Sequence, residues 1–332
     1  MKKQKIAIIG AGISAITIAQ ILKHTAHVSL FEKSLCVGGR MAVRRSEPYE
    51  FDHGAQFFIA KNKSFIDFIN PLIKKNIIKQ WDARFAEFNS SKIVRKIIWD
   101  SEYPHYVGAP GMNSIAKYLS KDLDIKLNTK IDRIVQNTKC GWELFDDNKN
   151  NLGVFDWVIS TAPPIQSAEI LPKQFKYQNE LLNKKMTGCF SLMLGFNKAL
   201  PLSWDAALIT NADISWISIN NSKPDRAKPF TMLIHSTNSW AEKHLSDDRE
   251  SVISYLNKET TRIIGHDTSR ADHIDIHGWR YANIIKQKES NLLIDYKNNL
   301  AACGDWLTHG RIESAFEAGF RTANTIKQTI TS

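Results

Sequence analysis

Residues 5–15 read KIAIIGAGISA, and this stretch decides the fold. Its first half is a short, β-rich apolar run of the kind that forms a strand buried on both faces. The second half, Gly10 to Ala15, matches the G-x-G-x-x-[G/A] turn. In such a turn the first glycine makes the bend, the second lets backbone approach a pyrophosphate, and the third small residue lets helix and strand pack closely. The stretch therefore predicts a strand, a phosphate-binding turn and a helix.

The residues that follow extend this prediction to a dinucleotide. The next apolar run, residues 28–31, ends in Glu32, which lies 22 residues beyond Gly10. A carboxylate at about this spacing accepts hydrogen bonds from the ribose hydroxyls of an adenosine. The N-terminus of the predicted helix, at Ile13 and Ser14, offers unpaired N–H groups to the anion. The alternative is that Glu32 is an ordinary surface carboxylate.

The composition excludes several classes of protein. Of the 332 residues 43% are hydrophobic and 23% charged, which is typical of a globular chain and not of a disordered or coiled-coil protein. The net charge is +10, and residues 1–100 carry 17 Lys and Arg against 8 Asp and Glu. The sequence has no zinc-finger pattern and no basic stripe interleaved with aromatic residues, so we expect no nucleic acid partner. No apolar run reaches the roughly 20 residues of a membrane span, so we expect no membrane partner.

The four cysteines, Cys36, Cys140, Cys189 and Cys303, are scattered. They form no C-x-x-C pair, so we expect neither a metal site nor a disulfide framework. Free thiols suit a reducing compartment, and we therefore expect a cytoplasmic protein. The basic first residues and the apolar run after them resemble a secretory signal, but the glycine spacing explains more of that stretch.

The residues after Glu32 indicate which dinucleotide the chain binds. They lead to Gly38-Gly39-Arg40. Two glycines let the backbone pass close to a second phosphate group, and the arginine can neutralise that group. This extension of the Rossmann motif resembles that of the flavin-dependent amine-oxidase superfamily.

Further segments bring the resemblance to the renalase-like branch, whose bacterial members are NAD(P)/FAD-dependent oxidoreductases. They are FDHGAQFF at 51–58, GAPGMN at 108–113, HGWRYA at 277–282 and CGDW at 303–306. The resemblance implies an α/β fold in which a Rossmann-type FAD-binding domain is interleaved with an α+β substrate domain built on an antiparallel sheet, as in amine oxidases and p-hydroxybenzoate hydroxylase. The FAD-binding domain would take residues 1–60, 107–168 and 287–332. The substrate domain would take residues 61–106 and 169–286.

The resemblance also implies which residues hold a non-covalent FAD. Asp305 would hydrogen-bond the ribityl-phosphate part, and the helix start around Arg311 would present N–H groups toward the pyrimidine end of the flavin. An Asp near a helix start is also a plain cap. The complete set is Gly10, Gly12, Ile13, Ser14, Ala15, Glu32, Lys33, Gly39, Arg40, Met41, Gly54, Ala55, Gln56, Phe57, Ile131, Ala162, Trp279, Gly304, Asp305, Arg311, Ile312 and Ala315.

Periodicity predicts several elements around these motifs. Residues 61–79 read as an amphipathic helix, and residues 81–99 as two strands around a turn at 89–91. Four β-rich runs between residues 190 and 235 imply an antiparallel sheet, followed by a helix over 247–264.

Flavin carries the redox step itself, so no catalytic triad or metal is required. The candidate catalytic residues are His277, Arg280 and Gln56, as contacts to the substrate or the flavin ring. Arg280 can pair with phosphate, and His277 can exchange a proton near neutral pH. The alternative for His277 is a structural role. The alternative for Trp279 and Tyr281 is that they are core residues on one face of a strand.

The resemblance implies hydride transfer from an isomeric dihydro-NAD(P) to flavin N5, with reoxidation by molecular oxygen to give hydrogen peroxide. The small-molecule substrate would be a dihydronicotinamide dinucleotide, and the basic first third of the chain suits its phosphates. Two alternatives stay open: a flavin-dependent amine oxidase of the same fold, and a flavin-binding sensor or scaffold without turnover.

Overall fold

The computed structural model describes residues 3–137, 141–285 and 291–331, which fold into two compact units. The first unit comprises Met1–Gly39, Ala116–Met186 and Ile284–Ser332, and the second Arg40–Ile115 and Thr187–Asn283. The chain thus crosses repeatedly between them. Residues 40–60 and 107–115, which the sequence assigned to the FAD-binding domain, lie in the second unit.

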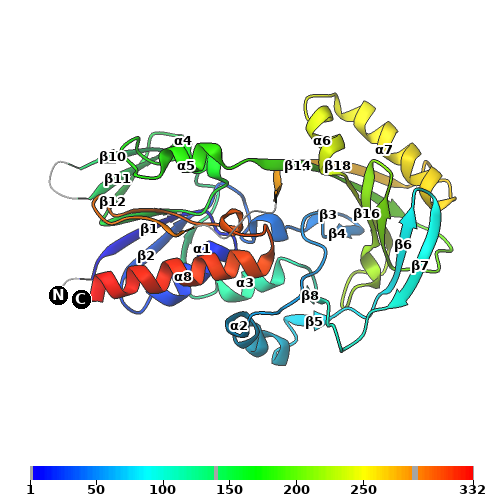
Figure 1. Ribbon diagram of the computed structural model, residues 1–332, viewed down its shortest axis with the longest axis horizontal. Coiled ribbons are helices and arrows are strands. Elements are labelled where there is room, and N and C mark those ends of the chain that lie inside the picture. Colours follow the sequence, from blue (N-terminus) through cyan, green and yellow to red (C-terminus); the bar gives the residue numbers. More distant parts are fainter. Residues whose placement is uncertain (1–2, 138–140, 286–290, 332) are drawn as a thin grey trace. The chain divides into compact units, whose positions relative to one another are not determined.

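A six-stranded sheet is the centre of the first unit (Figure 1). Its strands pair in parallel except at the edge formed by β19. Ile6, Ala7 and Ile8 of the central strand are fully buried, which confirms the strand predicted there. The order is β19 (Leu293–Asp295), β20 (Leu300–Ala302), β13 (Trp157–Ser160), β1 (Lys5–Ile9), β2 (His27–Phe31) and β9 (Asp124–Lys126).

Helices α1 (Ile13–Leu22) and α8 (Ile312–Thr331) lie side by side in this unit (Figure 1). Their close approach requires Gly319, because a Cβ there would lie 2.6 Å from the Ser14 carbonyl oxygen. The Ser14 hydroxyl also donates to the Ala315 carbonyl at 2.7 Å. The remaining elements are β10 (Ile131–Gln136), β11 (Trp142–Asp146) and β12 (Asn151–Phe155), which form an antiparallel sheet, and α4 (Pro164–Ile170) and α5 (Gln178–Asn183).

The second unit is built on a seven-stranded sheet. The predicted antiparallel pairing holds for β14–β17, β17–β16, β16–β15 and β6–β7, but β15 and β6 pair in parallel. Sequence periodicity cannot reveal this parallel pair, because its strands come from segments more than one hundred residues apart. The order is β18 (His273–Ile284), β14 (Met186–Phe196), β17 (Phe230–Ser236), β16 (Ile214–Ile219), β15 (Ala206–Thr210), β6 (Arg84–Asn89) and β7 (Lys92–Ile98).

The two faces of this sheet carry separate cores, because successive side chains of a strand point to opposite faces. Leu192 and Leu194 of β14 pack in a cluster with α6 (Asn238–His244) and α7 (Arg249–Ile264). Met193, between them, packs with Tyr49 and Phe51 of β4. The hairpin of β3 (Arg44–Ser46) and β4 (Tyr49–Phe51) is thereby held against the sheet.

The helix predicted over 61–79 ends earlier than expected. It is α2 (Lys63–Lys74), and Asn76 takes a left-handed conformation with φ of 57°. The chain then enters β5 (Ile78–Gln80), which pairs with β8 (Tyr106–Gly108). The last apolar residues of the predicted helix therefore belong to a strand. The short helix α3 (Ser114–Leu119) follows β8. Among the described residues, no helix combines the length and the apolar character needed to cross a bilayer.

Candidate functional site

Gly10 makes the sharp turn between β1 and α1. Its φ is 104°, a conformation that L side chains rarely adopt, and a Cβ there would lie 2.5 Å from Thr161 Oγ1. The Thr161 hydroxyl donates to the Ile9 carbonyl, and the Gly10 N–H donates to the Phe31 carbonyl at 2.8 Å. The turn is therefore held by β2 and by the segment after β13, and it excludes any side chain at position 10.

Gly12 differs from Gly10, because no atom lies within 4 Å of a Cβ built on it. It caps α1 in an extended conformation without a side-chain hydrogen bond. The N–H groups of the first helical turn, at Ile13, Ser14 and Ala15, have no acceptor inside the helix. Open space in front of a helix N-terminus fits a pyrophosphate group. The cradle predicted from the sequence thus suits the group it is assigned to.

Glu32 lies at the end of β2 and is 7% exposed. One carboxylate oxygen accepts the Ala11 N–H and the other the Ser34 N–H, each at 2.8 Å. The two bonds fix the carboxylate beside the glycine turn, and each oxygen keeps a lone pair for a ribose hydroxyl. The neighbouring Lys33 is exposed, and its Nζ lies 3.4 Å from Gln166 Oε1.

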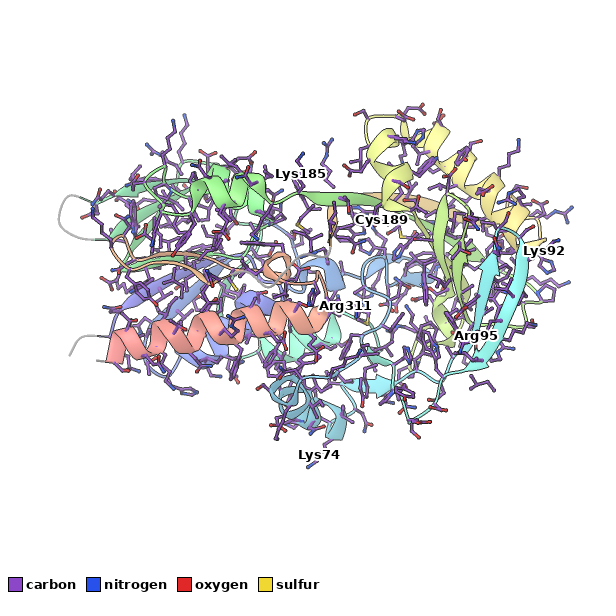
Figure 2. All side chains as sticks on the ribbon, viewed as in Figure 1. Lys74, Lys92, Arg95, Lys185, Cys189 and Arg311 are labelled. Carbon is purple, nitrogen blue, oxygen red and sulfur yellow. The ribbon has the colours of Figure 1, made fainter. Side chains whose placement is uncertain are left out.

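The C-terminal motif lies in the same unit. Asp305 is 4% exposed and begins the short 3₁₀ helix η3 (Asp305–Leu307). Trp306 donates its indole N–H to the Ala162 carbonyl at 3.1 Å, so the ends of β13 and β20 are tied together. Arg311 stands at the start of α8 (Figure 2), and its carbonyl accepts the Ala315 N–H. Since Ala315 also accepts from Ser14, the starts of α1 and α8 adjoin each other.

The predicted flavin contacts of the second unit are clustered around Gly54. A Cβ at Gly54 would lie 2.0 Å from the Arg40 carbonyl oxygen, which accepts the Ala55 N–H at 2.9 Å. The Arg40 guanidinium donates to the Ala282 carbonyl at 3.0 Å. Met41 is buried. Gly54 is therefore required by a close backbone approach within this unit.

His277 and Trp279 are brought together with His53, a residue that no sequence motif marks as part of the site. Trp279 donates its indole N–H to the His53 carbonyl at 2.9 Å, and the two rings stack at 5.2 Å. The His277 ring meets His53 edge-on at 5.1 Å. Arg280 does not join them: it is exposed, and side-chain alternation along β18 puts it on the opposite face from His277 and Trp279.

Both histidines are held neutral. Burial lowers the pKa of His53 to about 4, with added repulsion from His277, Arg44 and His235. Burial and Arg44 also lower the pKa of His277, against the opposing effect of Asp275. Two neutral imidazoles can accept or donate a hydrogen bond, but neither is a proton reservoir at neutral pH.

Gln56 is fully engaged within the chain. Its amide nitrogen donates to the Asp52 carbonyl at 2.6 Å and the Gly54 carbonyl at 2.8 Å. Its amide oxygen accepts from the Ser218 hydroxyl at 2.8 Å and from Lys223 Nζ at 3.1 Å. This pattern gives the side chain a structural task in shaping residues 52–56.

Phe57 leads into an aromatic cluster that the sequence did not predict. Its ring lies 4.9 Å from Trp99, 5.0 Å from His105 and 5.5 Å from Trp216. Trp99 and His105 stack at 3.7 Å. Phe57, His105 and Trp216 are half-buried, so part of this aromatic surface is open. The indole N–H of Trp216 and that of the adjacent Trp81 are buried and have no acceptor among the described residues.

Buried charges lie beside this cluster. Asp52, Lys223 and Arg226 have side-chain exposures of 1%, 0% and 2%. Lys223 Nζ lies 5.3 Å from the centre of the Trp81 ring, which meets Trp99 edge-on at 5.4 Å. Two cations and one carboxylate are therefore enclosed next to the aromatic surface.

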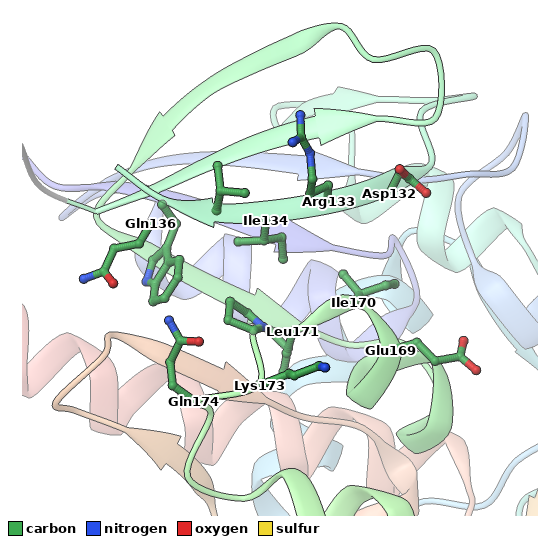
Figure 3. A pocket seen from close by; sticks show the side chains of 12 residues that line it. Asp132, Arg133, Ile134, Gln136, Glu169, Ile170, Leu171, Lys173 and Gln174 are labelled. Atoms are coloured by element: carbon green, nitrogen blue, oxygen red, sulfur yellow. The ribbon is translucent and has the colours of Figure 1, made fainter. Parts of the chain in front are cut away.

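Two cavities lie apart from these residues. One of about 440 Å³ lies between β10 and residues 169–174, with Ile134 and Leu171 on its walls (Figure 3). It adjoins Ile131, a buried residue that the sequence assigned to FAD, without including it. The other cavity, of about 420 Å³, is lined by residues that include Trp204 and Arg262. None of the residues predicted to bind FAD or substrate lines either cavity.

Residues 83–327 match the family described as flavin containing amine oxidoreductase, and residues 8–72 match a NAD(P)-binding Rossmann-like domain. The chain therefore belongs to the flavin-containing amine oxidoreductase family. It is a flavin-dependent oxidoreductase, and its cofactor is non-covalent FAD.

Two solved structures show the same fold. One, from Exiguobacterium sp. 255-15, is named as a candidate protoporphyrinogen oxidase; its TM-score is 0.80 at 11% identity, over 99% of this chain and 100% of that one. The other is wild-type putrescine oxidase bound to putrescine, with a TM-score of 0.73 at 12% identity, over 98% of this chain and 99% of that one. Both confirm the predicted combination of a Rossmann-type domain with a second, sheet-based domain.

Proposed function

We propose that this flavoprotein is a renalase-like oxidase that takes a hydride from isomeric dihydro-NAD(P) and returns the product NAD(P)⁺. Bound FAD supplies the hydride acceptor, and molecular oxygen reoxidises it with release of hydrogen peroxide. The residues assigned to FAD in each unit are proposed as its ligands. A cytoplasmic location is proposed as well, supported by the free thiols of Cys36, Cys189 and Cys303.

The observation that carries this proposal is the charge beside the aromatic cluster. Lys223 and Arg226 outnumber Asp52, so the buried charge there is positive. A dihydropyridine ring is uncharged and flat, and it can stack on Phe57 or Trp216. An ammonium substrate would meet repulsion at the same place.

The chain's own residues then have distinct tasks. The aromatic rings orient the substrate ring and exclude water, which raises the effective concentration of the reacting pair. The neutral His277 and His53 leave the substrate free of proton exchange as the hydride departs. Arg280 lies on the opposite face of β18 from His277 and Trp279, so we propose no substrate contact for it.

An amine oxidase is the second candidate, because aromatic faces also attract cations. The putrescine oxidase named above, whose title records bound putrescine, has the same fold. The positive buried charge beside the cluster counts against a cationic substrate here. A flavin-binding sensor without turnover is the third candidate.

Anaerobic mixing of the FAD-loaded enzyme with single reductants separates these candidates. We expect isomeric dihydro-NAD(P) to bleach the flavin absorbance within one turnover, and monoamines and diamines to leave it unchanged. Bleaching by amines alone would overturn the proposal in favour of an amine oxidase. A flavin that no reductant bleaches would leave the sensor as the better interpretation.

A further inference from the structure

Lys223 is a fully buried cation with three acceptors and no solvent contact. Its Nζ donates to Asp52 Oδ2 at 3.2 Å, to Gln56 Oε1 at 3.1 Å and to Asn220 Oδ1 at 3.1 Å. An ammonium group has three donors, so the charged form is completely satisfied. The neutral amine has only two donors, so deprotonation breaks one of these three hydrogen bonds.

The acceptors of Lys223 belong to one rigid assembly. Asp52 Oδ1 accepts the Met112 N–H at 2.9 Å, and Oδ2 accepts two hydrogen bonds from Arg226, at 3.0 and 2.8 Å. The Asn220 side chain receives the Asp52 N–H and donates to the Glu50 carbonyl. Lys223 therefore fixes both ends of the segment from Asp52 to Gln56, through the carboxylate at one end and the amide at the other.

This segment contains the His53 carbonyl and Gly54. The carbonyl accepts from Trp279 and from the Ser191 hydroxyl at 2.7 Å. Gly54 and Ala55 pack against the Arg40 carbonyl. A displacement of Asp52 or Gln56 is thus passed to Gly54 and Ala55, and through their contacts to Arg40 and Trp279, because close-packed groups cannot move independently.

We propose that Lys223 is a positioning residue, which holds residues 52–57 in the geometry that the bound flavin requires and releases that geometry when it loses its proton. This rests on the proposed function in one respect, the assignment of Gly54–Phe57 as flavin contacts.

The titration of Lys223 falls within an accessible pH range. Burial lowers its pKa to about 8, Asp52 opposes the shift and Arg226 adds to it. The carboxyl of Asp52 stays ionised: burial alone would raise its pKa, but Lys223 and Arg226 hold it below its usual range. His235 on β17 also faces this charge, and burial keeps its pKa at about 4, so it does not titrate in the same range. Below about pH 8 Lys223 is charged and fixes residues 52–57 through its hydrogen bonds. Above this pH the neutral amine fixes these residues less firmly.

The test uses visible circular dichroism of the bound flavin, which needs no substrate. We expect the wild-type spectrum to change as the pH passes about 8. Lys223→Met leaves Asp52 and Arg226 as a one-to-one ion pair, and should show an altered spectrum at neutral pH with no transition near pH 8. Lys223→Gln keeps N–H donors without titrating, and should restore the neutral-pH spectrum in part without restoring the transition. Lys198→Met, at an exposed position of the same unit, is the matched control.

The same variants are then reduced anaerobically by the reductant that bleaches the wild type. We expect Lys223→Met to slow flavin reduction about tenfold, as a misplaced group does, while Lys198→Met is unchanged. A wild-type spectrum that is flat across pH 8, or a Lys223→Met spectrum identical to the wild type, overturns the proposal even where a variant folds poorly, because the wild-type titration stands alone. Failure of dihydro-NAD(P) to reduce the flavin would instead refute the proposed function and leave the spectral test intact.

Discussion

At the scale of single residues, Gly10 and Gly12 show that one motif can contain two kinds of constraint. The backbone conformation and Thr161 exclude a side chain at position 10, whereas at position 12 nothing in the chain does so. Gly12 has an ordinary φ of −77°. The folding of the protein therefore does not require a glycine here, and we propose that the bound cofactor does.

Gly12→Ala should separate binding from stability. The added methyl group fills the space in front of α1, so we expect FAD affinity to fall at least about tenfold through lost close approach to the pyrophosphate. The melting temperature of the cofactor-free protein should stay unchanged. Calorimetric titration with FAD and thermal unfolding of the cofactor-free variant measure the two effects. Unaltered FAD affinity would mean that the phosphate does not lie at this turn.

The buried histidines predict a loss of stability on mild acidification. The pKa values of His53 and His235 in the folded protein are about 4, below the ordinary 6.5, so at intermediate pH only the unfolded chain binds these protons. The free energy of unfolding should therefore fall as the pH drops below 6.5, by up to about 1.4 kcal/mol per pH unit for each histidine. Urea unfolding at neutral pH and near pH 5 measures this. The double variant His53→Asn, His235→Asn should lose less stability than the wild type, and an equal loss would contradict the assignment.

At the scale of elements, the contact between α1 and α8 links the two ends of the chain to the phosphate cradle. Gly319→Ala places a methyl group 2.6 Å from the Ser14 carbonyl oxygen, so the helices must separate. We expect the unfolding free energy to fall by about 1–3 kcal/mol and FAD affinity to fall as well, because Ser14 lies in the first turn of α1. Thr329→Ala, at an exposed position of α8, is the control. Equal stability of the two variants would contradict the packing argument.

Elements were predictable from the sequence where their pattern is local. Alternation and apolar runs located β1, β2, β6 and β7, and the glycine motif located the start of α1. The pattern failed where two elements share one apolar stretch, as at the end of α2, because Ile77 and Ile78 continue the helical spacing while they belong to the β5 region. Helix α4 gives no clear local signal, because a proline pair is typical of a break in structure, although proline is well suited to the first helical turn.

At the scale of the whole molecule, the candidate site could be predicted only in part. Motifs with fixed spacing identified Glu32, Gly54 and Trp279 as residues to examine. They could not identify Trp216 or Lys223, which come from separate strands and turns and are brought near Phe57 and Asp52 by folding alone. A lone lysine or tryptophan carries no spacing signal, so only the folded structure reveals this half of the site.

The interleaved chain course explains why the proposed cofactor and substrate residues are spread from Gly10 to Ala315. Each unit consists of segments that are separated in the sequence. Neither unit therefore corresponds to one continuous fragment of the chain. The exposed strand β7 marks the edge of the second sheet, where Lys92 and Arg95 extend into solvent (Figure 2).

The central claim is that this flavoprotein oxidises an isomeric dihydro-NAD(P) to ordinary NAD(P)⁺. Single-turnover product analysis tests this claim most directly. FAD-loaded enzyme is mixed without oxygen with a limiting amount of isomeric dihydro-NAD(P), and reduced flavin and nucleotide are both quantified. We predict equal amounts of reduced flavin and ordinary NAD(P)⁺. Unreacted dihydronucleotide beside fully oxidised flavin would contradict the account.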